Sequence, residues 1–198
     1  MLWKTFYLIL FCWLTYFANA FGQEVFPTEN FDIRTLRNIA HTRTDTKTQV
    51  FRTISDANNY VNIGLPIGLF AIGAINDDKT MRQNAVYIGT STAITAVFNY
   101  GLKQLFKRKR PFRKYNNFVA VTQASGYSFP SGHTSSAFST AVSLSHAYPK
   151  WYVIAPSLMW SSSVAYSRMY LGVHYPSDIA AGALLGSGLA TGIHAIRK

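Results

Sequence analysis

Five long stretches of the chain contain no Asp, Glu, Lys or Arg, and no other feature limits the possible folds as strongly. Their bounds are Ala57–Asn76, Gln83–Leu102, Tyr115–Pro149, Trp151–Ser167 and Ile179–Ile196. Four of them are close to the roughly 20 residues that a membrane-spanning helix needs. The longest opens with loop-forming residues, so we expect its helix to start near His133 and to end by Pro149. The sequence therefore predicts an all-α fold, a bundle of about five core helices.

The hydropathy of these stretches is weak and leaves the environment of the bundle open. The mean hydropathy of the whole chain is only +0.06, and Thr134–His146 is rich in Ser and Thr. Pro66 and Pro156 interrupt two stretches, which membrane helices tolerate when their neighbours satisfy the freed backbone groups. We expect a membrane-embedded bundle, with a soluble exported all-α bundle as the alternative.

The first 20 residues have the three parts of an export signal. Lys4 supplies positive charge, the residues from Thr5 to Phe17 are apolar, and residues 18–20 read Ala-Asn-Ala, a small-residue cleavage site. We therefore predict a signal peptide over 1–20, with an uncleaved N-terminal anchor as the alternative. In either case the chain is directed out of the cytoplasm, so we expect no nucleic-acid partner.

Residues 21–56 differ in composition from the rest of the chain. They are polar and carry charges of both signs, and their apolar residues recur at intervals of three to four between Phe31 and Ala40. This spacing predicts one or two amphipathic helices, packed on the core or lying at a membrane surface. We expect 21–56 to be a helical lead-in and 57–198 to be the core domain.

The charges are distributed unevenly along the chain. The formal net charge is +11, and the 120 residues after Asp78 contain 13 Lys and Arg but a single acid, Asp178. This shortage of carboxylates nearly excludes a paired-carboxylate glycosidase and a carboxylate-bound Mg²⁺ or Ca²⁺ site in that part of the chain. The surplus of cations predicts an anionic ligand.

Three short motifs in this acid-poor part combine residues that are weak signals when taken singly. They are Lys103-(six residues)-Arg110-Pro111, Pro130-Ser131-Gly132-His133 and Ser167-Arg168-(five residues)-His174-(three residues)-Asp178. Together they supply two histidines, three cations, one carboxylate and a glycine-containing turn at the start of a helix. This set of groups suits displacement at phosphorus without a metal ion.

The cations and the turn are suited to hold a phosphoryl group. Lys103, Arg110 and Arg168 can neutralise the charge on the equatorial oxygens of a phosphoryl group in transfer. Ser131 and Gly132 precede the helix predicted from His133, so their N–H groups are expected to form an anion-binding turn.

The two histidines and the late acid are suited to covalent catalysis. Asp178 falls in the first turn of a helix that begins at Pro176, four residues after His174. There it can accept a hydrogen bond from one ring nitrogen of His174 and leave the other as a nucleophile. His133 remains to protonate the leaving oxygen.

With all eleven fixed motif positions present in the same order, the chain resembles the type 2 phosphatidic acid phosphatase superfamily, which includes bacterial acid phosphatases and vanadium haloperoxidases. The resemblance implies that His174 forms a phosphohistidine, that Asp178 orients it, and that His133 acts first as acid and then as base. It also implies that the phosphate is held by Lys103, Arg110, Ser131, Gly132 and Arg168.

The resemblance implies a metal-independent phosphatase without a cofactor, acting on a lipid phosphate, an isoprenyl diphosphate or a small phosphate ester. One alternative is a broad-specificity soluble periplasmic acid phosphatase. Another is a haloperoxidase, in which the same residues would hold vanadate. A third is a non-catalytic protein that binds anionic lipid through the basic residues 107–114, which otherwise form a solvated loop. Spans that alternate from an exported N-terminus place all three motifs on the outer face of the membrane.

Overall fold

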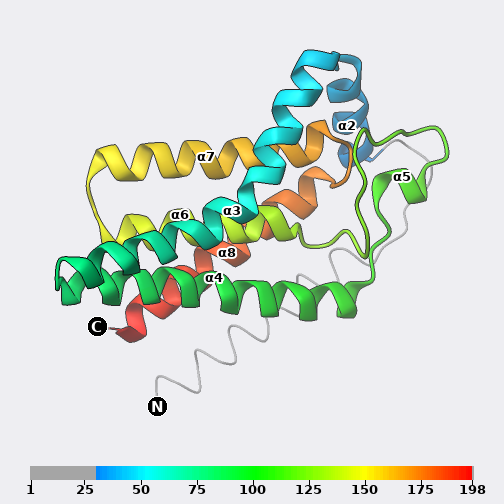
Figure 1. Ribbon diagram of the computed structural model, residues 1–198. Helices are drawn as coiled ribbons and strands as arrows, with labels where there is room; N and C mark the ends of the chain where they lie inside the picture. Colours follow the sequence, from blue (N-terminus) through cyan, green and yellow to red (C-terminus); the bar gives the residue numbers. More distant parts are fainter. Residues whose placement is uncertain (1–29, 198) are drawn as a thin grey trace. The chain divides into compact units, whose positions relative to one another are not determined.

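We describe residues 30–197 of the protein in a computed structural model, and the part from Phe31 onward forms one compact unit (Figure 1). Its helices are α2 (Phe31–His41), α3 (Asp45–Ile75), α4 (Lys79–Phe106), α5 (Pro111–Lys114), α6 (Gly132–Ala147), α7 (Trp151–Tyr170) and α8 (Pro176–Arg197). The described residues contain no strand. The predicted all-α fold with five long core helices is therefore confirmed. The predicted signal peptide, residues 1–20, lies outside the described part of the chain.

The ends of the long helices follow local sequence signals. The Thr44 hydroxyl accepts the Lys47 N–H at the start of α3, and the Asp78 carboxylate accepts the Met81 N–H at 2.9 Å at the start of α4. These side chains take up N–H groups that have no acceptor inside their helix. Helix α6 begins at Gly132 and ends at Ala147, close to the predicted bounds.

The change in composition at residue 57 does not coincide with the end of a helix. Helix α3 begins at Asp45 and runs without a break for 31 residues to Ile75, with Pro66 inside it. Its polar first turns pack on α7, where the Phe51 ring lies 4.5 Å from the Tyr170 ring between centroids. Part of the predicted lead-in is thus the beginning of a core helix.

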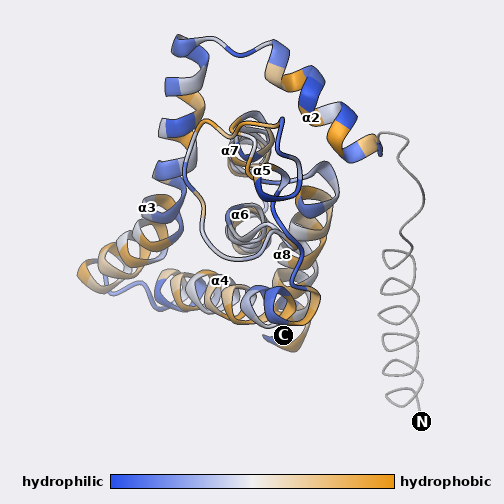
Figure 2. Cartoon of the chain, turned by 90° about the vertical axis from the view of Figure 1, so that its right-hand side faces the viewer, coloured by the Kyte–Doolittle hydropathy of each residue, from blue (hydrophilic) through white to orange (hydrophobic). Residues whose placement is uncertain are grey.

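Helix α6 is the centre of the bundle. The end-on view of Figure 2 shows it surrounded by α3, α4, α7 and α8, and it packs most extensively on α8. Two glycines of α8 make this close approach possible: a Cβ at Gly186 would lie 2.1 Å from the Ser135 carbonyl oxygen, and one at Gly182 would lie 2.8 Å from that of Ser131. The backbone of α8 therefore lies directly against the first turns of α6.

The bundle buries many small polar side chains and exposes many large apolar ones. The buried polar residues of the long helices include Ser55, Asn58, Asn62, Ser91, Thr95, Asn99, Ser139, Thr140, Ser143, Ser161 and Ser167. Several bond between helices, such as Thr95 to Ser139 at 3.0 Å. The exposed apolar residues include Ile63, Ile67, Phe70, Val97, Phe98, Trp151 and Met159. Small polar residues between helices and a large apolar exterior are typical of a bundle that faces lipid.

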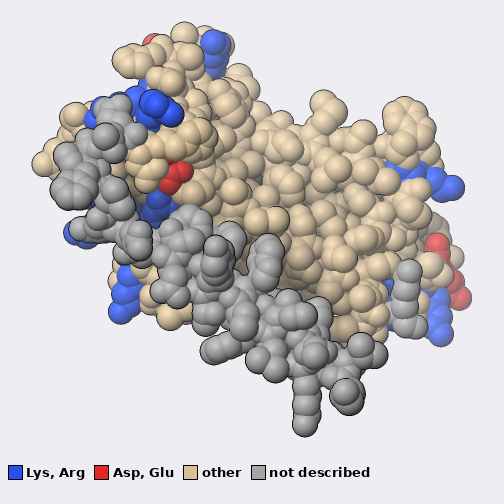
Figure 3. Space-filling view, turned by 180° about the vertical axis from the view of Figure 1, so that it is seen from behind, with Lys and Arg blue, Asp and Glu red and all other residues tan. Residues whose placement is uncertain are grey.

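The length of the helices and the position of the charges agree with this interpretation. Helices α3 and α8 are long and apolar enough to cross a membrane. Figure 3 shows charged side chains near both ends of one face, with an uncharged stretch of surface between them. We therefore treat the bundle as membrane-embedded, as the sequence predicted.

Candidate active site

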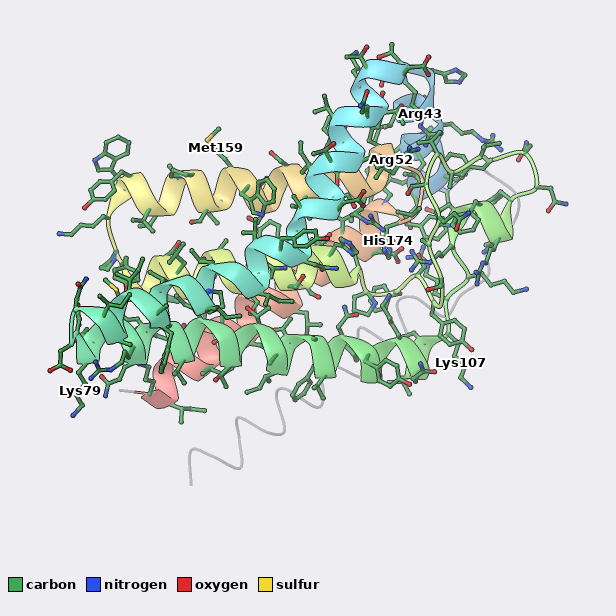
Figure 4. All side chains as sticks on the ribbon, in the orientation of Figure 1. Arg43, Arg52, Lys79, Lys107, Met159 and His174 are labelled. Atoms are coloured by element: carbon green, nitrogen blue, oxygen red, sulfur yellow. The ribbon has the colours of Figure 1, made fainter. Side chains whose placement is uncertain are left out.

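The three sequence motifs meet at one end of the bundle. Their residues come from the last turns of α4 and α7, the first turns of α6 and α8, and the loops after α4 and α7: Lys103, Arg110, Ser131, Gly132, His133, Arg168, His174 and Asp178. Figure 4 shows His174 toward the end of α4 that Lys107 follows, with Lys79 at the opposite end of the helix. Alternating helices bring distant parts of the sequence to this one end.

His174 and Asp178 form the predicted pair at the centre of the site. Nδ1 of His174 lies 3.3 Å from Oδ2 of Asp178, and both side chains are buried. The same carboxylate oxygen accepts the Tyr175 N–H at 3.0 Å and the Ser128 hydroxyl. Because a carboxylate can only accept here, the hydrogen of His174 belongs on Nδ1, and Nε2 carries the free lone pair.

Arg110 faces the other ring nitrogen of His174. Its Nη1 lies 3.1 Å from Nε2 and donates to the Val173 carbonyl at 2.9 Å, while Nη2 donates to the Ser125 carbonyl at 2.7 Å. The backbone therefore holds the guanidinium against the lone pair of Nε2. A phosphorus atom attacked by Nε2 would lie beside this guanidinium.

The protonation states suit a nucleophile beside a cation. Burial lowers the pKa of His174 to about 3, although Asp178 favours the charged form. Burial also lowers the pKa of Arg110, to about 10. At neutral pH, Arg110 is therefore charged and the His174 ring is uncharged.

The turn before α6, where an anion-binding role is predicted, is held by hydrogen bonds of Ser131. The Ser131 N–H donates to the Asp178 carbonyl at 3.0 Å, and the Ser131 hydroxyl accepts from Thr134 at 2.9 Å. Ser131 thus ties the start of α6 to the start of α8, and its N–H already has an acceptor. The N–H groups that the helix itself leaves without acceptors begin at Gly132, and the anion-binding role of Ser131 and Gly132 stays a prediction.

The two remaining cations come from the last turns of α4 and α7. Lys103 donates through Nζ to the Tyr127 carbonyl at 2.8 Å. Arg168 donates to the Ser55 hydroxyl, while none of the described residues accepts a hydrogen bond from its buried Nε. This leaves a donor for an anion. Both side chains, with Arg110, lie near enough to the His133 ring to interact with it electrostatically.

Two charged residues of the site were not among the predicted ones, Arg108 and Asp32. Arg108 lies 2.7 Å from Oδ1 of Asp178 and 2.7 Å from Oδ2 of Asp32, and its guanidinium covers the Tyr175 ring at 4.0 Å. Burial acts to lower the pKa of Arg108, but Asp178 and Asp32 outweigh it and raise that pKa. Arg108 is therefore paired with two carboxylates, although it belongs to the basic segment 107–114. Its place inside the first motif was the only signal in the sequence.

The donor groups of the site match an anion better than a metal ion. Within residues 30–197, His, Cys, Asp and Glu side chains form no group of three that could hold a metal. The site instead gathers Lys103, Arg110 and Arg168 around two histidines. Such a site can bind a phosphate and present an imidazole nitrogen to it.

Comparison with known proteins gives a family match over the part of the chain that contains all three motifs. The model of the PAP2 superfamily matches residues 84–198. An undecaprenyl-diphosphatase of Sulfolobus acidocaldarius is 36% identical over 110 residues, which cover 55% of this chain and 53% of the relative. A lipid A 4'-phosphatase of Bacteroides thetaiotaomicron is 31% identical over 103 residues, which cover 49% of this chain and 46% of the relative. The chain thus spans about half the length of these relatives.

Two solved structures share the fold over most of their length. The crystal structure of LpxE from Aquifex aeolicus superposes with a TM-score of 0.73 at 25% identity, covering 85% of this chain and 98% of that one. A transmembrane PAP2-type phosphatidylglycerolphosphate phosphatase from Bacillus subtilis superposes with a TM-score of 0.72 at 21% identity, covering 96% and 94%. The helical bundle described above is therefore the fold of these two proteins.

Proposed function

The chain belongs to the PAP2 superfamily, and from this premise we propose that it is a membrane phosphatase that hydrolyses a lipid phosphate or an isoprenyl diphosphate. One observation carries the proposal: the His174 ring is held between Asp178 at Nδ1 and Arg110 at Nε2. This arrangement fixes the tautomer of the ring, with the hydrogen on Nδ1 and the lone pair on Nε2, and it holds a cation next to Nε2. When a phosphate binds, Arg110 can donate to its oxygens instead, and Nε2 is then free to attack phosphorus.

In the first step, Nε2 of His174 attacks phosphorus and forms a P–N bond while the bond from phosphorus to the leaving oxygen breaks. His133 donates a proton to the leaving oxygen, which departs as an alcohol or as a prenyl phosphate. Nδ1 keeps its hydrogen bond to Asp178, whose negative charge stabilises the positive charge of the phosphorylated ring. Arg110, Arg168 and Lys103 offset the charge on the phosphoryl oxygens.

In the second step, water attacks the phosphohistidine. His133, now unprotonated, takes a proton from this water as the P–N bond breaks. Inorganic phosphate leaves, and His174 returns to its uncharged form. Neither step needs a metal ion or a cofactor, because the cations of the chain and the N–H groups of the α6 start supply the positive charge.

The proposed class of substrate rests on the relatives and on the outer surface of the bundle. Relatives named for undecaprenyl diphosphate and for lipid A act on phosphates carried by membrane lipids. The apolar exterior of α3, α4 and α7 would contact the tail of such a substrate while its phosphate reaches the end of the bundle. We propose that this end lies at the outer face of the membrane, as an exported N-terminus followed by alternating spans requires.

Phosphate release by the purified protein tests this function. We expect the wild type in detergent to release phosphate from an isoprenyl diphosphate or a lipid phosphate faster than from a small soluble ester, with EDTA present. His174→Ala should abolish the release, and Arg34→Gln, an exposed change on α2, should leave it unchanged. Activity that survives His174→Ala would contradict the assigned nucleophile, and activity lost in EDTA would contradict the metal-free reaction.

A further inference from the structure

The carboxylate of Asp32, on α2, lies at the start of α8. Oδ1 of Asp32 accepts the Ser177 N–H at 3.0 Å, and Oδ2 accepts the Ser177 hydroxyl. Ser177 is the second residue of α8, where N–H groups have no acceptor in their own helix and a negative charge is favoured. Asp32 therefore caps α8 from another helix, 145 positions earlier in the chain.

Arg108 connects this cap to the acid of the site. Its Nη2 lies 2.7 Å from Oδ2 of Asp32, and its Nη1 lies 2.7 Å from Oδ1 of Asp178. The guanidinium also rests on the face of the Tyr175 ring, 4.0 Å from its centroid. One planar cation thus bridges two carboxylates that come from opposite ends of the described chain.

This bridge gives the two oxygens of Asp178 different partners. Oδ2 faces Nδ1 of His174 and accepts the Tyr175 N–H, whereas Oδ1 accepts from Arg108. The Asp178 side chain is fully buried, so an Oδ1 without a donor would be costly. Arg108 therefore holds the carboxylate in the rotation that directs Oδ2 to His174.

We propose that Asp32 and Arg108 are positioning residues that act through Asp178 to hold His174 for attack on phosphorus. The proposal rests on the proposed phosphatase function. Neither residue touches the substrate in this account. The consequence is that α2, which lies outside the segment 84–198 matched by the family model, is part of the working site.

Kinetics of the full chain in detergent test the proposal with Asp32→Asn, Arg108→Gln and the double variant. We expect each single variant to lower kcat about 10- to 100-fold, the effect of losing a hydrogen bond to a charged group, with KM changed less than about threefold. The double variant should be no slower than the slower single one, because both changes act through the same carboxylate. Arg34→Gln, on the same helix, is the control.

The conservative variant Arg108→Lys separates positioning from a general loss of structure. A lysine keeps the charge but does not bridge two carboxylates with a planar fork, so kcat should lie between that of Arg108→Gln and the wild type. If Arg108→Gln does not fold, Arg108→Lys replaces it in the comparison of the single and double variants. Wild-type kcat in folded Asp32→Asn and Arg108→Gln would overturn the proposal, as would single effects that multiply in the double variant.

Orthovanadate, which mimics the phosphoryl group in transfer, gives a readout that does not depend on turnover. We expect the two single variants to bind it more weakly than the wild type, by about tenfold or more, in thermal-shift titrations. Vanadate affinities equal to that of the wild type would overturn the positioning role. A wild type that binds vanadate but releases no phosphate would overturn the proposed function alone.

Discussion

Nη1 of Arg110 lies 3.1 Å from Nε2 of His174, so a cation lies next to the ring nitrogen that carries the lone pair. The contact also completes the assignment of the ring hydrogen, since a guanidinium donates and requires a lone pair on Nε2. Three backbone carbonyls, of Ser125, Gly126 and Val173, hold the guanidinium in this place. Arg110 is therefore preorganised for the charge that develops during transfer.

Replacing Arg110 by lysine should lower kcat/KM about 100- to 1,000-fold, the range seen when one donor to a developing charge is removed. A lysine retains the charge but loses the planar contacts to the carbonyls and to the ring nitrogen. Steady-state kinetics with a lipid phosphate measure the change. Arg113→Lys, at an exposed position three residues later, is the matched control. A decrease in kcat/KM of less than about fivefold for Arg110→Lys would show that the reaction does not use the planar guanidinium of Arg110.

The uncharged state of His174 predicts a loss of stability in acid. The pKa of this ring is about 3 in the fold and 6.5 ordinarily, so between these values the unfolded chain binds a proton that the fold does not. The contribution of this ring to the free energy of unfolding is therefore fully present above pH 6.5. It falls as the pH drops toward 3, by up to about 1.4 kcal/mol per pH unit. His174→Gln removes this contribution. Its melting temperature in detergent should fall less between pH 7 and pH 4.5 than that of the wild type, whereas parallel decreases would contradict a buried neutral ring.

The contact between α6 and α8 predicts a difference between two glycines of the same helix. A Cβ at Gly186 would lie 2.1 Å from the Ser135 carbonyl oxygen, whereas nothing lies within 4 Å of one at Gly188. Gly186→Ala should therefore destabilise the protein by about 1–3 kcal/mol or more, the usual cost of overpacking. Gly188→Ala should be neutral or slightly stabilising, because alanine favours a helix over glycine. Thermal unfolding in detergent compares the two variants. Equal melting temperatures would contradict the close packing of α8 on α6 at Gly186.

Much of the fold could be predicted because its signals are local. The uncharged stretches showed where the long helices lie. The turn residues around Pro130 marked the start of α6, and Pro149 marked its end. The spacing of His174 and Asp178 placed a carboxylate within reach of the ring. The start of α3 at Asp45 could not be predicted, because its polar first turns pack on α7, and composition does not reveal that contact.

The missed part of the site depends on contacts between distant residues. Asp32 looks like an acid in the first turn of a surface helix, and Arg108 looks like one cation in a basic segment. Their pairing spans 76 positions and exists only because α2 packs near the start of α8. It also explains why this end of the bundle tolerates so many cations on the proposed outer face: Arg108 is neutralised by carboxylates, and Arg110 is part of the site.

The most direct test of the account is to trap the phosphoenzyme. The protein is mixed with substrate labelled with ³²P in the transferred phosphate, quenched in alkali, in which phosphohistidine survives, and mapped by mass spectrometry. We expect one phosphoryl group on His174 in the wild type and none in His174→Gln. We expect the label to persist longer in His133→Gln, because no base remains to activate water. Label on another residue, or hydrolysis with inversion at phosphorus and no trapped intermediate, would contradict the proposed mechanism.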